Sequence, residues 1–244
     1  MSIVLWNKLE GITGGIVPSQ VGNNGNPVGS PTFSPAMFGN GEVISSAANN
    51  VNFGQVISNS VLNSAFTLSF YFIPNFGYTT TATKCLPSLE DSSTYWGFDV
   101  LWSFSEGGAV LGCFNVFIYA PYPTILAYNF TPPNFTSGSM HRIDISVDNL
   151  RGAGDRVRMY VDGVQLSLNS INGADASWNF TPTMNLFTQG EGWPFGGNHI
   201  IDDIIVQDVG QTSFPNWNKE GELAPTPKGF NNFFNRIEGM KACS

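Results

Sequence analysis

Charged residues are scarce in this sequence of 244 residues. Asp, Glu, Lys and Arg make up 11% of the chain, whereas roughly a quarter is ordinary for soluble domains. Ten Lys and Arg residues stand against eighteen Asp and Glu residues, and no basic cluster is longer than "RVR" at 156–158. Affinity for nucleic acid rests on many contacts between cations and phosphates, so the sequence argues against a nucleic-acid partner. A surface so poor in charge is typical of subunit contacts or of an Asn-rich, loop-rich β-protein, and both interpretations stay open.

Long apolar runs are missing as well. The first residues, "MSIVLWNKLEG", contain an apolar run of four with no basic segment before it, which is too short for a signal peptide. No later run approaches the ~20 apolar residues that span a bilayer. We therefore expect no membrane insertion, and a chain that is either made and kept soluble or leaves the cell by a route other than a signal peptide, such as lysis.

Cysteines are few and badly placed for cross-linking. Cys85, Cys113 and Cys243 cannot all pair within one chain, and none stands in a metal-binding spacing. We expect no disulfide framework and no cysteine-held cofactor. Cys113 falls in an apolar run, where a buried thiol packs as a small hydrophobe, and Cys243 is expected to be exposed.

Helical periodicity is absent before residue 225, and a period of two dominates instead. In "FTLSFYFI" from Phe66 and "HRIDISVD" from His141, apolar residues occupy alternate positions. This alternation predicts strands with one face in the core and one in water. Further candidate strands are "IVLW" from Ile3, "VNFGQVI" from Val51, "YWGFDVLWSF" from Tyr95, "AVLGCFNVFIYA" from Ala109, "MNLF" from Met184 and "HIIDDIIVQD" from His199.

The sharpest local pattern is "RVRMYVDGVQLSL" from Arg156 to Leu168. Asp162 and Gly163 lie between two alternating apolar runs, and a two-residue turn of type I′ needs positive φ at both positions. The pattern predicts a β-hairpin, and it assigns Asp162 to the turn rather than to a metal or a reaction.

Many short strands with turn residues between them and no helices among them predict an all-β fold. We expect a two-sheet antiparallel jelly-roll sandwich over residues 1–212. Residues 213–244 form a C-terminal arm with a possible short helix. On that helix Phe230, Phe233, Phe234 and Ile237 would share one face, which packs back on the domain or docks on a neighbouring subunit.

Five motifs follow one another in a recognisable order: "FGNGE" from Phe38, "FTLSFYFIPN", "HRIDISVD", "RMYVDGVQL" and "IIDDIIVQD". This order resembles the laminin-G-like and concanavalin A-like jelly-roll superfamily over roughly residues 3 to 212. The resemblance implies a fold rather than a function, because this fold carries lectins, adhesion modules, glycosidases, lyases and viral structural domains.

Catalytic patterns are missing. The Glu-x-Asp-x-x-Glu strand of the retaining glycosidases in this superfamily does not occur, and His141 and His199 lie near no nucleophile pattern. Strand parity places Asp202 on the apolar side with Ile200, and Asp203 on the opposite side. One inward and one outward carboxylate do not make a catalytic pair, so we expect no enzyme.

An inward Asp202 needs a partner, because an isolated buried carboxylate is costly. It accepts hydrogen bonds from loop backbone, or it contributes to a calcium site, as the resemblance implies for the terminal strand. The matching early loop offers Asn23, Asn24 and Asn26 but no Asp, so calcium is a candidate cofactor without its usual carboxylates.

Aromatic residues in Gly- and Pro-rich segments are the candidates for glycan binding: Trp193, Trp178, Tyr95 and Trp96. Sugar rings stack on flat aromatic faces, although these rings equally suit the ends of the sandwich or a subunit contact.

Two main functions remain, with a polysaccharide hydrolase or lyase of unfamiliar site as a third and less favoured class. The first is a non-enzymatic structural or assembly protein on a phage or other virion surface, as a decoration or tail-associated protein. Its partners would be copies of itself or capsid and tail proteins, with cell-surface glycans as a further ligand. The alternative is a lectin or adhesion module of a cellular organism, located outside the cell or on its surface.

Overall fold

A computed structural model describes residues 2–211 apart from gaps at 37–38, 47, 78, 81, 92–96, 104–108, 120–125, 174–176 and 190–196. The predicted C-terminal arm therefore lies outside the described residues. Within them the chain forms seventeen strands and one short helix. The elements are β1 (Ile3–Asn7), β2 (Asn26–Val28), β3 (Thr32–Ala36), β4 (Gly39–Ile44), β5 (Asn50–Asn52), α1 (Asn59–Leu62), β6 (Ala65–Ile73), β7 (Lys84–Cys85), β8 (Ser88–Asp91), β9 (Gly97–Trp102), β10 (Phe114–Ile118), β11 (Leu126–Phe130), β12 (His141–Asp148), β13 (Val157–Val161), β14 (Val164–Gln165), β15 (Leu168–Asn172), β16 (Met184–Phe187) and β17 (His199–Gln207).

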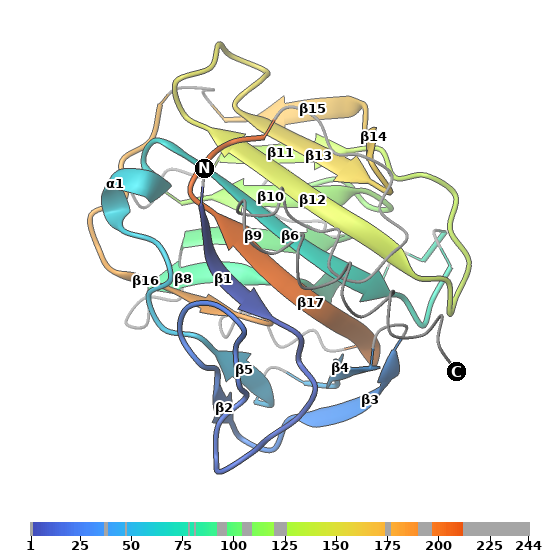
Figure 1. The fold of residues 1–244 in the computed structure, drawn as a ribbon. Helices are drawn as coiled ribbons and strands as arrows, with labels where there is room; N and C mark the ends of the chain where they lie inside the picture. Colours follow the sequence, from blue (N-terminus) through green and yellow to red (C-terminus); the bar gives the residue numbers. More distant parts are fainter. Residues whose placement is uncertain are drawn as a thin grey trace, which may run out of the picture.

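Two antiparallel sheets form the sandwich, so the predicted all-β fold is confirmed (Figure 1). The first sheet has the order β14-β13-β12-β6-β17-β4-β3, with β1 paired to β17. The second has the order β15-β11-β10-β9-β8-β16-β5-β2, with β7 paired to β9. Alternate residues of both sheets point inward and pack as one hydrophobic core, for example Phe70, Ile145, Val100 and Val116.

The hairpin is confirmed in detail. Asp162 and Gly163 have φ of 52° and 78°, and Val161 pairs with Val164 across the turn. The carboxylate of Asp162 accepts hydrogen bonds from the backbone N–H of Arg142 at 2.9 Å and contacts the Nδ1 of His141 at 2.7 Å. The turn residue thus also fastens the hairpin to the start of β12.

The expected wet faces are wrong. On β12 the side chains opposite the core, Arg142, Asp144 and Ser146, are 0–2% exposed, and Thr67 and Ser69 on β6 are equally buried. Polar residues at these positions are retained because they bond to one another or to backbone rather than to water. The predicted alternation of apolar and polar residues is present in both strands, but the polar face is buried rather than exposed to solvent.

The expectation of no early helix is also wrong. The one-turn helix α1 is capped by Ser58, whose side chain accepts from the N–H of Val61. Four residues are too few for a helical period to show in the sequence. No helix among the residues described is long and apolar enough to cross a membrane.

Candidate functional site

Asp202 and Asp203 both lie on the outer face of the first sheet, so the predicted inward position of Asp202 is wrong. Asp202 pairs with Tyr71, whose ring belongs to an outer cluster with Trp6 and Ile205. The register then shifts before Ile205, and Asp203 has φ of 47°. This β-bulge breaks the period of two that the parity argument assumed.

The two carboxylates have different surroundings. Asp203 accepts a hydrogen bond from the indole Nε1–H of Trp6 at 3.0 Å, and its own N–H donates to Asp202 Oδ1 at 2.8 Å. Burial, followed by the neighbouring charge of Asp203, raises the pKa of Asp202 to about 8. At neutral pH Asp202 is therefore mainly protonated, which removes one of the two charges that would otherwise repel.

An ion pair continues this cluster across β12. The guanidinium of Arg142 donates from Nε to Asp144 Oδ1 at 2.8 Å, and both side chains are at most 2% exposed. Burial raises the pKa of Asp144, while the charge of Arg142 opposes that effect. Burial likewise raises the pKa of Tyr71 well above its usual range.

We call Ser69, Tyr71, Arg142, Asp144, Asp202 and Asp203 the polar layer. It brings together carboxyl groups whose pKa values are raised by burial, Asp144 and Asp202, a feature also found in general acid-base sites. All six residues are at most 2% exposed, however, so the polar layer is closed to a substrate. We interpret it as a structural network that joins β6, β12 and β17.

A second group of acids, which the sequence analysis did not single out, lies on the outer face of the other sheet. Glu90 on β8 and Asp99 on β9 act on Tyr119, whose pKa is raised chiefly by burial and then by these two charges. Both acids are 0% exposed, so this group is closed to solvent in the same way.

The predicted calcium site stays a prediction. Asn24 Oδ1 accepts from the N–H of Ser19, and the Asn23 amide donates to the carbonyl oxygens of Phe53 and Gln55. These amides hold the early loop in place. The described residues contain no group of three or more His, Cys, Asp or Glu that could bind a metal ion.

Trp178 does not present its ring to solvent. It is 5% exposed, its Nε1 faces the carbonyl oxygen of Leu62, and its backbone is held on both sides by Asn149. It therefore closes one end of the sandwich, which is the alternative that the sequence left open. Trp193, Tyr95 and Trp96, like the assembly candidates Phe230, Phe233, Phe234 and Ile237, lie outside the described residues.

The same end of the sandwich carries a feature that sequence reasoning missed. Six of the ten Lys and Arg residues are described, and three of these six, Arg151, Arg156 and Arg158, fall in the loop between β12 and β13 and its flanks. We call residues 148–158 the arginine segment. The signal in the sequence was "RGAGDRVR", which is dense in cations for a chain of net charge −8.

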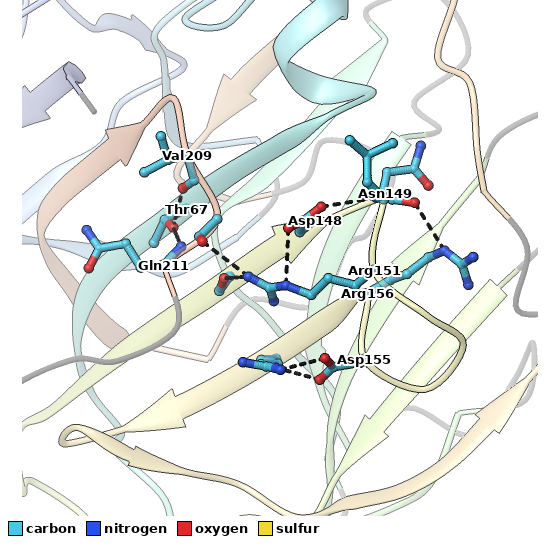
Figure 2. A network of polar contacts seen from close by, with 12 residues as sticks. Thr67, Asp148, Asn149, Arg151, Asp155, Arg156, Val209 and Gln211 are labelled. Carbon is cyan, nitrogen blue, oxygen red and sulfur yellow. Dashed lines mark hydrogen bonds and ion pairs between the residues drawn. The ribbon is translucent and has the colours of Figure 1, made fainter.

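Bonds to fixed groups orient this segment (Figure 2). Arg151 pairs with Asp148 at 3.2 Å and donates to the carbonyl oxygen of Gly210 at 3.1 Å. Arg156 donates from Nε to the carbonyl oxygen of Asn149 at 3.2 Å. Leu150, directly before Arg151 in the sequence, is 82% exposed.

Arg158 is tied to Asp155 by its Nε and Nη2, and the two bonds run in parallel as a fork. This pairing lowers the pKa of Asp155. Arg151 and Arg158 are thus each paired with an acid of the segment, and their side chains are 12% and 23% exposed. Three guanidinium groups against two carboxylates leave the segment with an excess of one positive charge, and guanidinium groups suit planar anions such as carboxylates.

Comparison with known proteins finds the fold and no family. No protein-family model and no curated protein sequence matches the chain. Among solved structures, a Trypanosoma rangeli sialidase matches with a TM-score of 0.56 and 14% identity over 86% of this chain and 31% of its own. The binding domain of botulinum neurotoxin DC in complex with SialylT matches with a TM-score of 0.61 and 12% identity over 97% of this chain and 52% of its own.

A third structure comes from botulinum neurotoxin type C and is described by the statement that cell entry of the toxin depends on interaction with two ganglioside molecules. It matches with a TM-score of 0.57 and 14% identity over 97% of this chain and 51% of its own. This chain thus spans 31–52% of the length of these three chains. At such identities the likeness shows the fold alone, a jelly-roll-like β-sandwich of lectin type. The concanavalin A-like superfamily itself stays a prediction.

Proposed function

We propose that this chain is a non-catalytic glycan-binding module that recognises acidic, sialylated glycans through the arginine segment. The observation that carries the proposal is the gathering of Arg151, Arg156 and Arg158, against the two acids Asp148 and Asp155, in one segment of a chain with a net charge of −8. Structures named for sialic acid, SialylT or gangliosides share its fold, and this supports the choice of ligand class.

The chemistry of the segment fits a sugar that carries a carboxylate. A guanidinium can bind a carboxylate with two parallel N–H donors, and it does so at lower desolvation cost than an ammonium. The exposed side chain of Leu150 offers an apolar contact beside these donors for the C–H face of a sugar ring. Neutral glycans lack the carboxylate, so they should bind less tightly.

Catalysis is left out of the proposal for a geometric reason. The buried acids Asp202, Asp203, Glu90 and Asp99 are at most 1% exposed, and the described tyrosines, Tyr71, Tyr119, Tyr128 and Tyr160, are at most 5% exposed. Most glycosidases need two carboxyl groups open to the glycosidic bond, and sialidases use a tyrosine as the nucleophile. Incubation with a sialylated substrate should therefore release no sialic acid, and release above the buffer control would contradict this part of the proposal.

Binding is tested with surface-immobilised oligosaccharides with and without a terminal sialic acid. We expect the wild-type chain to bind the sialylated form more tightly, and Arg156→Ala to weaken that binding by about tenfold, the loss of one charge-assisted contact. Arg156→Lys keeps the charge but loses the planar fork, so it should restore part of the affinity. Lys8→Ala removes one cation elsewhere and is the matched control.

Thermal melting of each variant shows whether the fold is intact, because Arg156 also bonds to Asn149. Equal binding of sialylated and neutral forms would contradict the ligand class. Loss of binding in Lys8→Ala but not in Arg156→Ala would contradict the site. If the site lies instead on the rings of Trp193, Tyr95 and Trp96, Trp193→Ala will abolish binding and Arg156→Ala will not.

A second proposed role is assembly, with a place on a virion surface or, as the alternative, outside a cell. The charge-poor composition and the edge strand β15, which carries no charge and no proline, favour this role. Cofractionation of the protein with virions that are identified by electron microscopy would support this role. A protein found solely in the unassembled fraction would contradict it.

A further inference from the structure

The two sheet orders end in four strands that differ in how well they are protected against pairing. An unpaired edge presents free N–H and C=O groups to other strands, and proteins blunt such edges with proline, charge or short length. β2 contains Pro27 and β3 contains Pro35, while β14 is two residues long. β15 is five residues long, "LNSIN", without proline or charge. Its pairing with β11 shifts register once, at Asn169, and this irregularity is its one protective feature in the described structure.

β15 is open on one side in the part of the chain that is described. Its one partner strand there is β11, with Tyr128 opposite Ile171 and Ala127 opposite Asn172. The side chains of Asn169, Ser170 and Asn172 are exposed, and among the described residues no further strand pairs with β15. Figure 1 shows β15 as the last strand of its sheet, close to β14.

The chain passes directly from the edge of one sheet to the edge of the other. The N–H of Leu166 donates to the carbonyl oxygen of Met159 on β13, and the carbonyl oxygen of Ser167 accepts from Thr131 beyond β11. Residues 163–172 therefore line one side of the whole sandwich, and none of them is charged. We call this the 163–172 edge.

Apolar surface accompanies the open backbone. Val164 is 65% exposed, and Leu168 and Ile171 are partly buried hydrophobic residues that pack against the core. A strand added to β15 would cover part of this surface while it satisfied the backbone groups, so both effects favour association.

We propose that the 163–172 edge is a docking surface for a second copy of this chain, which pairs through its own β15 in antiparallel orientation. Two copies related by a two-fold axis bring the same strand against itself, so a charged edge would repel its copy. In a chain of net charge −8, a charge-free edge is the side on which identical copies meet without that repulsion.

The experiment is light scattering and sedimentation on the full chain across a wide range of protein concentration. The wild-type chain should form a dimer, and the double variant Asn169→Lys with Asn172→Lys should raise its dissociation constant by about tenfold or more, because it places like charges across the two-fold axis. The matched control is Asn26→Lys with Thr32→Lys, two exposed positions on β2 and β3, which should leave the dimer unchanged.

Hydrogen exchange identifies the strand that pairs. Amides of Leu168–Asn172 should become more protected as the concentration of the wild-type chain rises, and those of the lysine variant should not. The proposal would be overturned by a wild-type chain that stays monomeric at every concentration. It would also be overturned by a monomer whose β15 binds an extended peptide of another protein in place of a second copy. The same holds for a dimer that the β2 and β3 variant disrupts and the β15 variant does not. Glycan binding by single copies is measured separately, so either proposal can fail alone.

Discussion

The indole of Trp6 on β1 donates a hydrogen bond of 3.0 Å to the carboxylate of Asp203 in the bulge of β17. The two residues lie 197 positions apart in the sequence, and both are buried. Their bond fastens the first strand to the last on the outer face of the sheet. It also explains why the bulge residue is an acid: the carboxylate accepts from an indole that would otherwise lack a partner in a buried place.

Replacement of Trp6 by Phe should destabilise the fold. The ring is kept in part, but the bond to the buried carboxylate of Asp203 is lost, which costs about 1–3 kcal/mol. Urea unfolding measures the difference. Asp203→Asn keeps an acceptor oxygen toward Trp6 and should cost less; equal stability of Trp6→Phe and wild type would show that the bond contributes nothing.

Alkaline pH should weaken the fold through Glu42. This side chain points into the core from β4, and burial raises its pKa from 4.5 to about 8. The folded form thus holds a proton that the unfolded chain releases, so the stability from Glu42 is full below about pH 4.5 and is lost as the pH rises from there through about 8.

The measurement is the unfolding free energy at acidic and alkaline pH. We expect a loss on the order of a few kcal/mol in the wild-type chain and a smaller loss in Glu42→Gln, which stays neutral. Asp202, with its pKa of about 8, contributes in the same window, so Glu42→Gln with Asp202→Asn should be nearly flat. A Glu42→Gln chain as sensitive to alkali as wild type would refute the assignment.

Acid should weaken the fold through His199. Burial lowers the pKa of this imidazole from 6.5 to about 3, so the unfolded chain binds a proton that the folded chain refuses. Stability from this residue is full above about pH 6.5 and is lost as the pH falls toward about 3. His199→Gln should show a shallower loss over that range in the same unfolding assay, and an unchanged slope would argue for another acid-sensitive group.

Asn149 should be among the costliest polar residues to replace. Its amide donates to the carbonyl oxygens of Asn63 and Trp178 at 3.0 and 2.8 Å and accepts from the N–H of Trp178 at 3.1 Å. Asn149→Ala leaves these buried backbone groups unpaired, at a cost of about 2–4 kcal/mol. The exposed Asn134→Ala is the control, and equal melting temperatures for the two variants would show that this connection is dispensable.

Local patterns predicted what local physics determines. The hairpin at Asp162 and Gly163 and the alternation of apolar and polar residues on β12 are confirmed, because turn geometry and strand pleating act on neighbouring residues. The burial of the polar face of β12 depends on distant parts of the chain, so the alternation did not predict it. The bulge at Asp203 was missed because a single residue with positive φ leaves no trace in a hydrophobic period. β2 and β3 were missed because their short, proline-containing sequences resemble connections.

The candidate site was harder to predict for a physical reason. Whether Trp178 offers a ring to a ligand depends on Asn149, 29 positions away, and no spacing rule reports that contact. The arginine segment was visible as a run of cations, but its place at one end of the sandwich follows from the pairing of β12 with β13.

The most direct test of glycan recognition is a titration of the isotopically labelled protein with a sialylated trisaccharide, followed by backbone amide spectra, with the same oligosaccharide lacking sialic acid as the control. The proposed function predicts saturable shifts in residues 148–158 with the sialylated sugar, and much weaker shifts with the control. Shifts of equal size with both sugars, shifts confined to other parts of the molecule, or none at all would contradict it.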